Sequence, residues 1–271
     1  MEPKTGKVDG ISLKKYHSLP GWSKSRLDKI NRSPAHRVYA KENPKEPTPA
    51  QVFGSALHCM VLTPDLFKLE YAVAPKCDKR TNEGKIIISS FESLNAGKEI
   101  LSSEQFEQIE GMKAAIFSHP LASQLLKDGE AEKSFFWIDE VTELQCKARP
   151  DYFRNDGICI DIKTTTDATF KEFQRDAYNF RYHVQAAFFM DGIYKSTKLE
   201  YTDFVIIAIE KEAPYGIIVY RMDEMAIDVG RDCYYRNLQT AKEWEENPDA
   251  FKTVYKISEE PIELTLPRWA E

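Results

Sequence analysis

Apolar residues in the first part of the chain recur at helical spacing among charged residues. After Ser23 or Ser25, either of which can cap a helix, Leu27, Ile30 and Val38 follow this spacing. Helices are predicted in three segments, at 21–42, 50–62 and 102–120. The stretches 41–50, which is rich in proline, and 77–85, which is polar and basic, are predicted to be loops.

The pattern changes in the second part of the chain, where short apolar runs are separated by turn residues. Strands are predicted at 132–139, 143–153, 157–164, 201–210 and 215–222. Longer segments with helical spacing lie at about 168–194 and 223–247. We therefore predict an α/β fold with a mixed central sheet flanked by helices. It would form a single domain over 1–271, with a mainly helical part at 1–120 and a sheet-containing core at 130–271.

Composition places the chain among ordinary globular proteins. The 271 residues, 42% hydrophobic and 30% charged, suffice for a large core. The polar N-terminus is not a signal peptide, and no apolar run approaches the roughly 20 residues that span a bilayer. Five cysteines without a C-x-x-C pair argue against a disulfide framework, a zinc site or an iron–sulfur cluster. We expect a cytoplasmic protein with reduced thiols and no membrane partner.

The net charge of −6 argues on its own against nucleic acid as a partner, because phosphate binding needs a basic surface. Net charge averages over the molecule, however. A local basic stripe, or a metal ion in an acidic site, can still hold DNA.

Chemistry is concentrated in the segment CIDIKTTTD, at 159–167. Residues two apart in a strand share a face, so Asp161 and Lys163 project together, opposite Ile162. Asp151 follows Pro150 at the end of the preceding strand, and a hairpin can bring both aspartates together. Two converging carboxylates repel each other, and Mg²⁺ would resolve this. The alternative is an ordinary Asp–Lys ion pair, which is the commoner meaning of an isolated D-x-K.

Three further residues could join this site. Glu132 begins an earlier strand, and His58 is the histidine of an otherwise apolar helix. Gln185 shares a helical face with Tyr178, Tyr182 and Phe189, at offsets typical of a packing face. A satisfied core histidine and a packing face are the structural alternatives.

These motifs, in this order, resemble the RecB-like branch of the PD-(D/E)XK nuclease superfamily. That branch has a G-x-x-x-H helix, then an Asp, then D-x-K, then Q-x-x-x-aromatic. The corresponding residues here are Gly54 to His58, Asp151, Asp161 to Lys163, and Gln185 to Phe189. Phe189 stands where the branch often has tyrosine.

Longer segments are similar to the RecE (exonuclease VIII) family of nuclease domains. They are YHSLPGWSKSRLD, VAPKCDKRTNEGK, CKARPD, DIKTTTD, FRYHVQAAF, YYRNLQT and LTLPRWA, and they cover almost the whole chain. The resemblance implies an ATP-independent exonuclease that degrades one strand of duplex DNA from its 5′ end. It further implies a 3′ overhang used in recombination by a RecT-type annealing partner, and a ring-shaped homotetramer.

Residue roles also follow from the resemblance. His58, Asp151 and Asp161 would bind Mg²⁺, with the Ile162 carbonyl as a further ligand. Mn²⁺ is expected to substitute. Lys163 would be the catalytic lysine, Gln185 would support the site or touch DNA, and Glu132 would lie near a second metal position.

Basic and hydroxyl residues are candidates for DNA contacts. Ser23, Lys24 and Ser25 lie at a helix start, where backbone N–H groups favour a phosphate. Arg80 and Lys85 could hold the backbone near the duplex fork. For both groups a solvated polar loop is the alternative.

Arg149 could contact the scissile phosphate with two hydrogen bonds. Its alternative is a structural pair with a nearby carboxylate. For the whole protein, the alternatives are an endonuclease of the same superfamily and a catalytically inactive DNA-end-binding scaffold. The complete set of His58, Asp151, Asp161 and Lys163 argues against an inactive scaffold.

Overall fold

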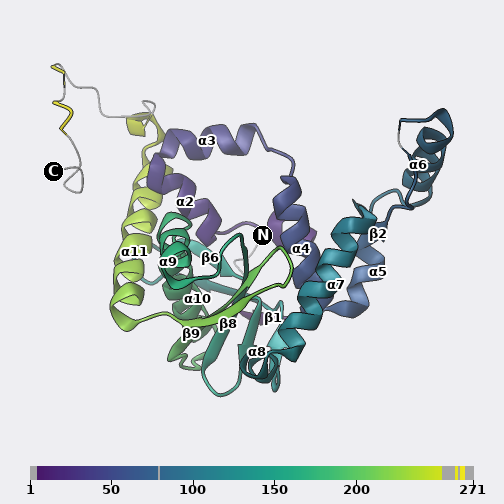
Figure 1. The fold of residues 1–271 in the computed structure, drawn as a ribbon. Coiled ribbons are helices and arrows are strands. Elements are labelled where there is room, and N and C mark those ends of the chain that lie inside the picture. The colour runs from purple at the N-terminus through teal and green to yellow at the C-terminus, as the bar shows by residue number, and fades with distance from the viewer. Residues whose placement is uncertain (1–4, 79, 252–259, 262, 266–271) are drawn as a thin grey trace.

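A computed structural model describes residues 5–78, 80–251, 260–261 and 263–265 (Figure 1). Arg268 and Trp269, in the terminal LTLPRWA segment, lie outside the described residues. The helices are α1 (Leu13–Ser18), α2 (Lys24–Arg32), α3 (Pro34–Glu42), α4 (Pro49–Leu62), α5 (Pro64–Glu70), α6 (Asn82–Leu94), α7 (Ser103–Ser118), α8 (Pro120–Leu125), α9 (Phe170–Asn179), α10 (Tyr182–Thr197) and α11 (Glu224–Glu246), with a 3₁₀ turn at Pro248–Phe251. The strands are β1 (Gly6–Val8), β2 (Tyr71–Val73), β3 (Glu99–Leu101), β4 (Gly129–Ala131), β5 (Ser134–Ile138), β6 (Gln145–Ala148), β7 (Tyr152–Arg154), β8 (Ile158–Thr165), β9 (Asp203–Glu210) and β10 (Ile217–Arg221).

Five strands form the central sheet, in the order β10-β9-β8-β7-β4. β8 and β9 run parallel, and every other neighbouring pair in this sheet runs antiparallel. The parallel pair is joined through α9 and α10, as a parallel connection requires a crossover. This mixed sheet with flanking helices confirms the predicted α/β class.

Side chains of β8 and β9 alternate between two apolar cores, one on each face of the sheet. Cys159 and Phe204 pack with residues of α10 and α11, whereas Ile160 and Ile162 pack with residues of α4 and α7. Figure 1 shows these helix pairs on opposite sides of the sheet. Because successive strand residues point to opposite faces, Asp161 projects toward α10.

The predicted strand 143–153 is wrong in one respect, because it is two strands in different sheets. β6 belongs to a three-stranded sheet of order β1-β5-β6, and β7 belongs to the central sheet. Pro150 lies at the break, where its missing N–H cannot contribute to a ladder. The chain therefore turns at 149–151 and places Asp151 at the start of β7.

The predicted helix 168–194 is also wrong, because it is two helices, α9 and α10. Between them Arg181 adopts a left-handed conformation, with φ 57° and ψ 48°. A left-handed residue cannot continue a right-handed helix, so the direction of the chain changes there. Tyr178 therefore lies on a different helix from Tyr182, Gln185 and Phe189.

Helix starts in the first part of the chain follow the predicted caps. Ser23 is the N-cap of α2, and the predicted segment 21–42 divides at Ser33, whose side chain accepts a hydrogen bond from the His36 backbone. Pro34 then opens α3, as proline favours the first turn of a helix. The predicted loop 77–85 ends earlier than expected, because Thr81 caps α6.

Two longer helices begin with a capping box, in which side chain and backbone satisfy each other. Thr48 and Gln51 form the box of α4, and Ser102 and Gln105 form that of α7. α4 matters for function because it carries His58. No helix within the described residues is long and apolar enough to cross a membrane.

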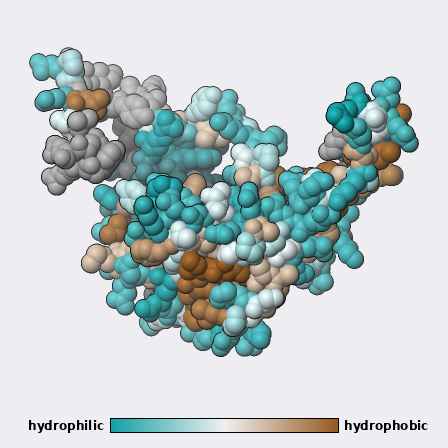
Figure 2. Space-filling model, in the orientation of Figure 1, coloured by the Kyte–Doolittle hydropathy of each residue, from teal (hydrophilic) through white to brown (hydrophobic). Residues whose placement is uncertain are grey.

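α6 projects from the rest of the molecule, at the end of an arm that includes α5 and β2 (Figure 1). Its aliphatic side chains Ile86, Ile87 and Leu94 are exposed. Figure 2 shows hydrophobic groups at this tip and over the region of β9 and β10, on an otherwise mostly hydrophilic face. α6 is therefore not part of either core.

Candidate metal-dependent active site

Asp161 and Lys163 share one face of β8, as the strand period predicts. The Lys163 ammonium lies 2.5 Å from Oδ2 of Asp161, and Asp161 is 1% exposed. From α10, the Gln185 side chain donates a hydrogen bond to the other carboxylate oxygen. Asp161 is therefore fixed from both the strand and the helix that covers it.

Asp151 and His58 form the second part of the site, beside β8. Oδ2 of Asp151 accepts a hydrogen bond from the Ile162 backbone N–H at 2.8 Å and lies 3.4 Å from Nδ1 of His58. The other His58 nitrogen, Nε2, is 2.8 Å from the Ile162 carbonyl. Since a carbonyl can only accept, Nε2 carries the proton in this contact.

Glu132 reaches the same point from the end of β4. It has a left-handed backbone with φ 55°, and its N–H donates to the Asp151 carbonyl at 2.9 Å. One potential ligand atom from each of His58, Glu132 and Asp151 lies within 4.8 Å of the others. The structure thus brings together a helix residue and two strand-end residues that are far apart in the sequence.

Electrostatics in this cluster are dominated by buried carboxylates. Burial, reinforced by the charge of Asp151, raises the pKa of Asp161 to about 6. Burial and Asp151 likewise raise the pKa of Glu132. Burial also acts to raise the pKa of Asp151, but the charges of His58 and Lys163, together with hydrogen bonds from His58 and the Ile162 backbone, outweigh burial and lower this pKa. Mutual repulsion among carboxylates that cannot move apart favours a bound cation.

His58 is the basic group that pairs with these carboxylates. Burial disfavours its charged form, yet Asp151 raises the pKa of His58 to about 9. The proton on Nδ1 of the imidazolium thus lies beside Asp151, where a metal ion bound by both residues would replace it. A metal ligand must be the neutral imidazole, so metal binding here would release a proton.

The residues present fit a divalent metal ion. Two carboxylates and an imidazole are suitable ligands for Mn²⁺, and carboxylates with water suit Mg²⁺. Oδ2 of Asp161 is also buried, and its contact with Lys163 lacks hydrogen-bond geometry, which leaves capacity for a cation. Asp161 and the Ile162 carbonyl lie beside the cluster of His58, Glu132 and Asp151 rather than within it. Their roles as ligands stay predictions.

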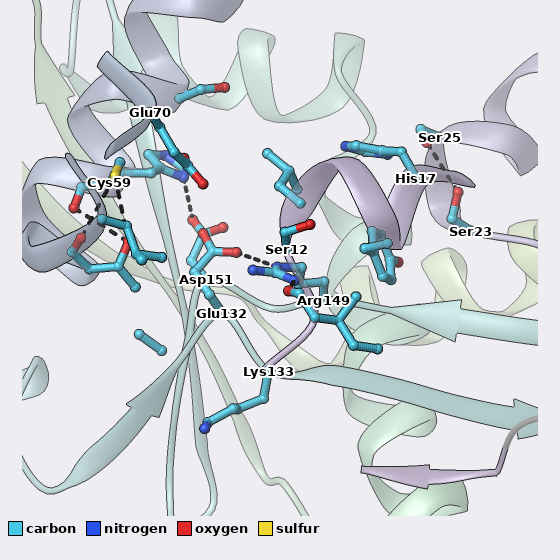
Figure 3. A pocket seen from close by; sticks show the side chains of 18 of the residues that line it. Ser12, His17, Ser23, Ser25, Cys59, Glu70, Glu132, Lys133, Arg149 and Asp151 are labelled. Carbon is cyan, nitrogen blue, oxygen red and sulfur yellow. Dashed lines mark hydrogen bonds and ion pairs between the residues drawn. The ribbon is translucent and has the colours of Figure 1, made fainter. Parts of the chain in front are cut away.

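A cavity of about 770 Å³ opens over the cluster (Figure 3). His58, Glu132, Asp151 and Gln185 line it, and so does Glu70, which ends α5 and which no spacing in the sequence indicated. A volume of this size accommodates a nucleotide-sized group.

The predicted phosphate-binding residues Ser23, Lys24 and Ser25 line this same cavity. Ser23 makes no side-chain cap bond to α2, and its Oγ lies 3.1 Å from that of Ser25. The Lys24 ammonium donates to the Phe180 carbonyl at 2.7 Å and pairs with Asp28 at 2.9 Å. The start of α2 therefore faces the metal cluster across the cavity.

The other predicted DNA contacts have different surroundings. Arg149 lines the cavity, but its Nε donates to Glu132 at 2.6 Å and its Nη1 to the Ile11 carbonyl at 2.7 Å. The structural alternative, a pair with a carboxylate, is thus present. Arg80 is exposed and pairs with Asp78, and Lys85 lies on α6, so neither lines the cavity.

Tyr182 has a closer relation to the site than the sequence indicated. The Lys163 ammonium lies 5.0 Å from the centroid of its ring, within cation–π range. The sequence leaves the role of Tyr182 open, and its position three residues before Gln185 is the available signal. Lys163 is therefore held between a carboxylate and an aromatic ring.

The chain matches one described sequence family. The description is "PDDEXK-like domain of unknown function (DUF3799)", and the match covers residues 23–253. No curated protein matches the chain in sequence.

Solved structures of other proteins are similar to this chain, and two of them are described as exonucleases. The crystal structure of a candidate exonuclease from Eubacterium rectale shares 16% identity with a TM-score of 0.59, over 94% of this chain and 97% of the other. This likeness shows a common fold. An alkaline exonuclease from Laribacter hongkongensis also matches at 16% identity, over 69% of this chain and 98% of the other, with a TM-score of 0.28.

Proposed function

The chain belongs to the PDDEXK-like family DUF3799, and on that basis we propose that it is a metal-dependent exonuclease of DNA. The observation that carries the proposal is the convergence of His58, Glu132 and Asp151 within 4.8 Å, beside the Asp161–Lys163 pair. The names given to the Eubacterium rectale and Laribacter hongkongensis proteins agree with exonuclease activity.

Each residue of the site has a distinct task in this proposal. His58, Glu132, Asp151 and Asp161 would hold Mg²⁺ or Mn²⁺, which when bound supplies charge stabilisation to the phosphoryl group and activates water. Burial disfavours the Lys163 cation, but Asp161 and Asp151 outweigh it and raise the Lys163 pKa, so its ammonium stays charged. A charged Lys163 donates hydrogen bonds, which suits orienting the attacking water and stabilising charge on the phosphate.

Recognition of a DNA end is supported by the opposite wall of the cavity. The uncapped start of α2 offers backbone N–H groups, the hydroxyls of Ser23 and Ser25, and the Lys24 ammonium. This combination suits a phosphate group. A 5′-terminal phosphate held there would place a nearby phosphodiester bond over the metal cluster.

The finer features rest on resemblance to the RecE (exonuclease VIII) family. We propose ATP-independent 5′-to-3′ degradation of one strand of linear duplex DNA, which leaves a 3′ overhang for recombination. A RecT-type annealing protein would be the partner, and a ring-shaped homotetramer would surround the DNA. With a net charge of −6, such a ring would need its basic residues to face inward.

The experiment uses linear duplex DNA labelled separately at its 5′ and 3′ ends, with a covalently closed circle as control. With Mg²⁺ and without ATP, we expect early release of the 5′ label as mononucleotides and an intact circle. Cutting of the circle would indicate an endonuclease instead. End binding without cleavage, in either Mg²⁺ or Mn²⁺, would indicate the inactive scaffold.

A further inference from the structure

Two aromatic side chains lie exposed beside the candidate active site, at the junction of α9 and α10. Tyr178 is 75% exposed and Phe180 is 59% exposed. We call this pair the aromatic rim. Large apolar rings in contact with solvent cost free energy, so a rim of this kind favours a function in binding.

The rim is continuous with the catalytic lysine through stacked rings. Phe180 stacks on Tyr182 with centroids 5.9 Å apart and planes at 23°, and Lys163 lies over the Tyr182 ring. Tyr178 stacks on His183 with centroids 6.3 Å apart and planes at 8°. Each ring of the aromatic rim thus stacks on another ring, and Phe180 stacks on the one that contacts Lys163.

The backbone holds the rim in place. The left-handed conformation of Arg181 turns the chain between the two helices, and the Phe180 carbonyl accepts the hydrogen bond from Lys24. Lys24 lines the cavity, so the Phe180 backbone lies one hydrogen bond away from a cavity residue. A fixed ring loses little conformational entropy when a planar group stacks on it.

Two cationic side chains lie beside the rim. Lys24 and Arg181 both pair with Asp28, at 2.9 and 3.3 Å, so two cations share one carboxylate. Two Arg181 nitrogens, Nη1 and Nη2, are buried without a hydrogen-bond partner. The surplus of positive charge beside the rim would attract a polyanion that passes over the surface.

We infer that the aromatic rim stacks unpaired bases of the DNA strand that enters or leaves the active site. This inference rests on the proposed function and adds a single-stranded segment to the substrate. Stacking accepts any base, because every base has a π face, and so suits degradation without sequence preference. The positive charge beside the rings matches the phosphates that accompany the bases.

The test measures binding of a short single-stranded oligonucleotide that carries 2-aminopurine near its 5′ end, in EDTA to prevent cleavage. Wild type should quench the fluorophore by stacking. Phe180→Ala and the double variant Tyr178→Ala/Phe180→Ala should bind about ten times more weakly and lose the quenching. Phe180→Trp should retain both. Phe117→Ala, which removes an exposed ring of α7, is the matched control and should behave as wild type.

Several outcomes would overturn the inference. Unchanged affinity and quenching in Phe180→Ala, with wild type active on duplex DNA, would reject base stacking on the aromatic rim and leave the proposed function intact. Unchanged affinity with an altered oligomeric state by light scattering would assign the rim to a protein contact. Wild type that neither binds nor cleaves DNA would reject the proposed function and the rim together.

Discussion

At the scale of single residues, Asp161 shows how the site depends on contacts from separate elements. Lys163 approaches one carboxylate oxygen and Gln185 donates to the other. The period of two in a strand predicts the Asp161–Lys163 contact. The contact with Gln185 requires α10 to cross over β8, which periodicity alone does not specify. Support of the site by Gln185 was expected from family resemblance.

Replacement of Gln185 should weaken catalysis by releasing Asp161. We expect Gln185→Ala to reduce the cleavage rate on the order of 10–100-fold, as loss of an outer partner of a metal ligand does. Gln185→Glu keeps the size of the side chain but adds a carboxylate beside Asp161, so it should lose at least as much activity. Single-turnover rates at saturating Mg²⁺ measure this, with circular dichroism as the folding control. Rates equal to wild type in both variants would exclude a supporting role.

The partner of Arg149 could not be predicted from the sequence. Its position before Pro150 and Asp151 suggested a contact with the scissile phosphate. In the structure its guanidinium pairs with Glu132, whose left-handed backbone places the carboxylate within reach. A pair between residues 17 positions apart depends on the β4–β7 register, which local sequence does not reveal.

At the scale of elements, the connection between β8 and β9 departs most from the sequence pattern. The apolar spacing continues through Phe180 and Arg181 as if one helix ran to residue 194. Tertiary packing instead favours a left-handed Arg181 and an independent α10, which packs closely on α11. A Cβ added to Gly230 of α11 would lie 2.2 Å from the His183 carbonyl oxygen.

Gly230→Ala should therefore destabilise the protein. The methyl group would collide with backbone, which cannot rotate away, and we expect a loss of about 1–3 kcal/mol in unfolding free energy. Gly54→Ala is the matched control, because a Cβ there meets nothing within 4 Å. Alanine is the better helix former, so that change should stabilise by up to about 1 kcal/mol. Urea unfolding measures both, and equal stability of the two variants would contradict the close α10–α11 packing.

A buried carboxylate fixes the turn after β5 to the same helix. Asp139 accepts hydrogen bonds from the Thr142 backbone and hydroxyl, at 3.0 and 2.8 Å, and from Lys195 of α10 at 2.9 Å. Burial acts to raise the pKa of Asp139, but the Lys195 and Thr142 hydrogen bonds outweigh it and lower the pKa. Asp139 therefore stabilises the fold when its carboxylate is ionised.

The sign of this shift makes a prediction about acid unfolding. A carboxylate with a lowered folded pKa contributes stability above its unfolded pKa, near 3.8, and loses it as the pH falls through the folded value. Asp139→Asn should therefore be less stable than wild type at neutral pH, and the difference should shrink below about pH 4. Asp156→Asn, in an exposed pair with Arg154, serves as control. A difference that stays constant with pH would contradict the assignment.

At the scale of the whole molecule, the cavity collects residues from α1, α2, α4, α5 and α10 and from the ends of β4 and β6. The sequence predicted the fold class and the shared face of Asp161 and Lys163 on β8, whereas the roles of the site residues stay predictions. It could not predict that 143–153 divides between two sheets, because each half has ordinary strand character. Nor could the sequence place α6 and Lys85 away from the cavity. Whether a helix with apolar residues is buried depends on which other elements pack against it, and local sequence does not specify these contacts.

Binding of a divalent metal ion should stabilise the folded protein as a whole. At a concentration a hundred times the dissociation constant, Mg²⁺ or Mn²⁺ would add about 2.7 kcal/mol to the unfolding free energy. Differential scanning calorimetry should show a higher Tm in metal than in EDTA for wild type. Asp151→Asn should show no such difference. A metal-dependent shift that persists in Asp151→Asn would place the ion elsewhere.

The most direct test of a metal-dependent nuclease centred on the Asp161–Lys163 strand is the release of acid-soluble nucleotides from linear duplex DNA. It compares wild type with Lys163→Gln, and with Lys127→Gln as an exposed control, in Mg²⁺ and in EDTA. We expect release by wild type and Lys127→Gln in Mg²⁺ but not in EDTA, and a loss of at least about 100-fold in Lys163→Gln. Cleavage by Lys163→Gln at the wild-type rate, or cleavage in EDTA, would contradict it.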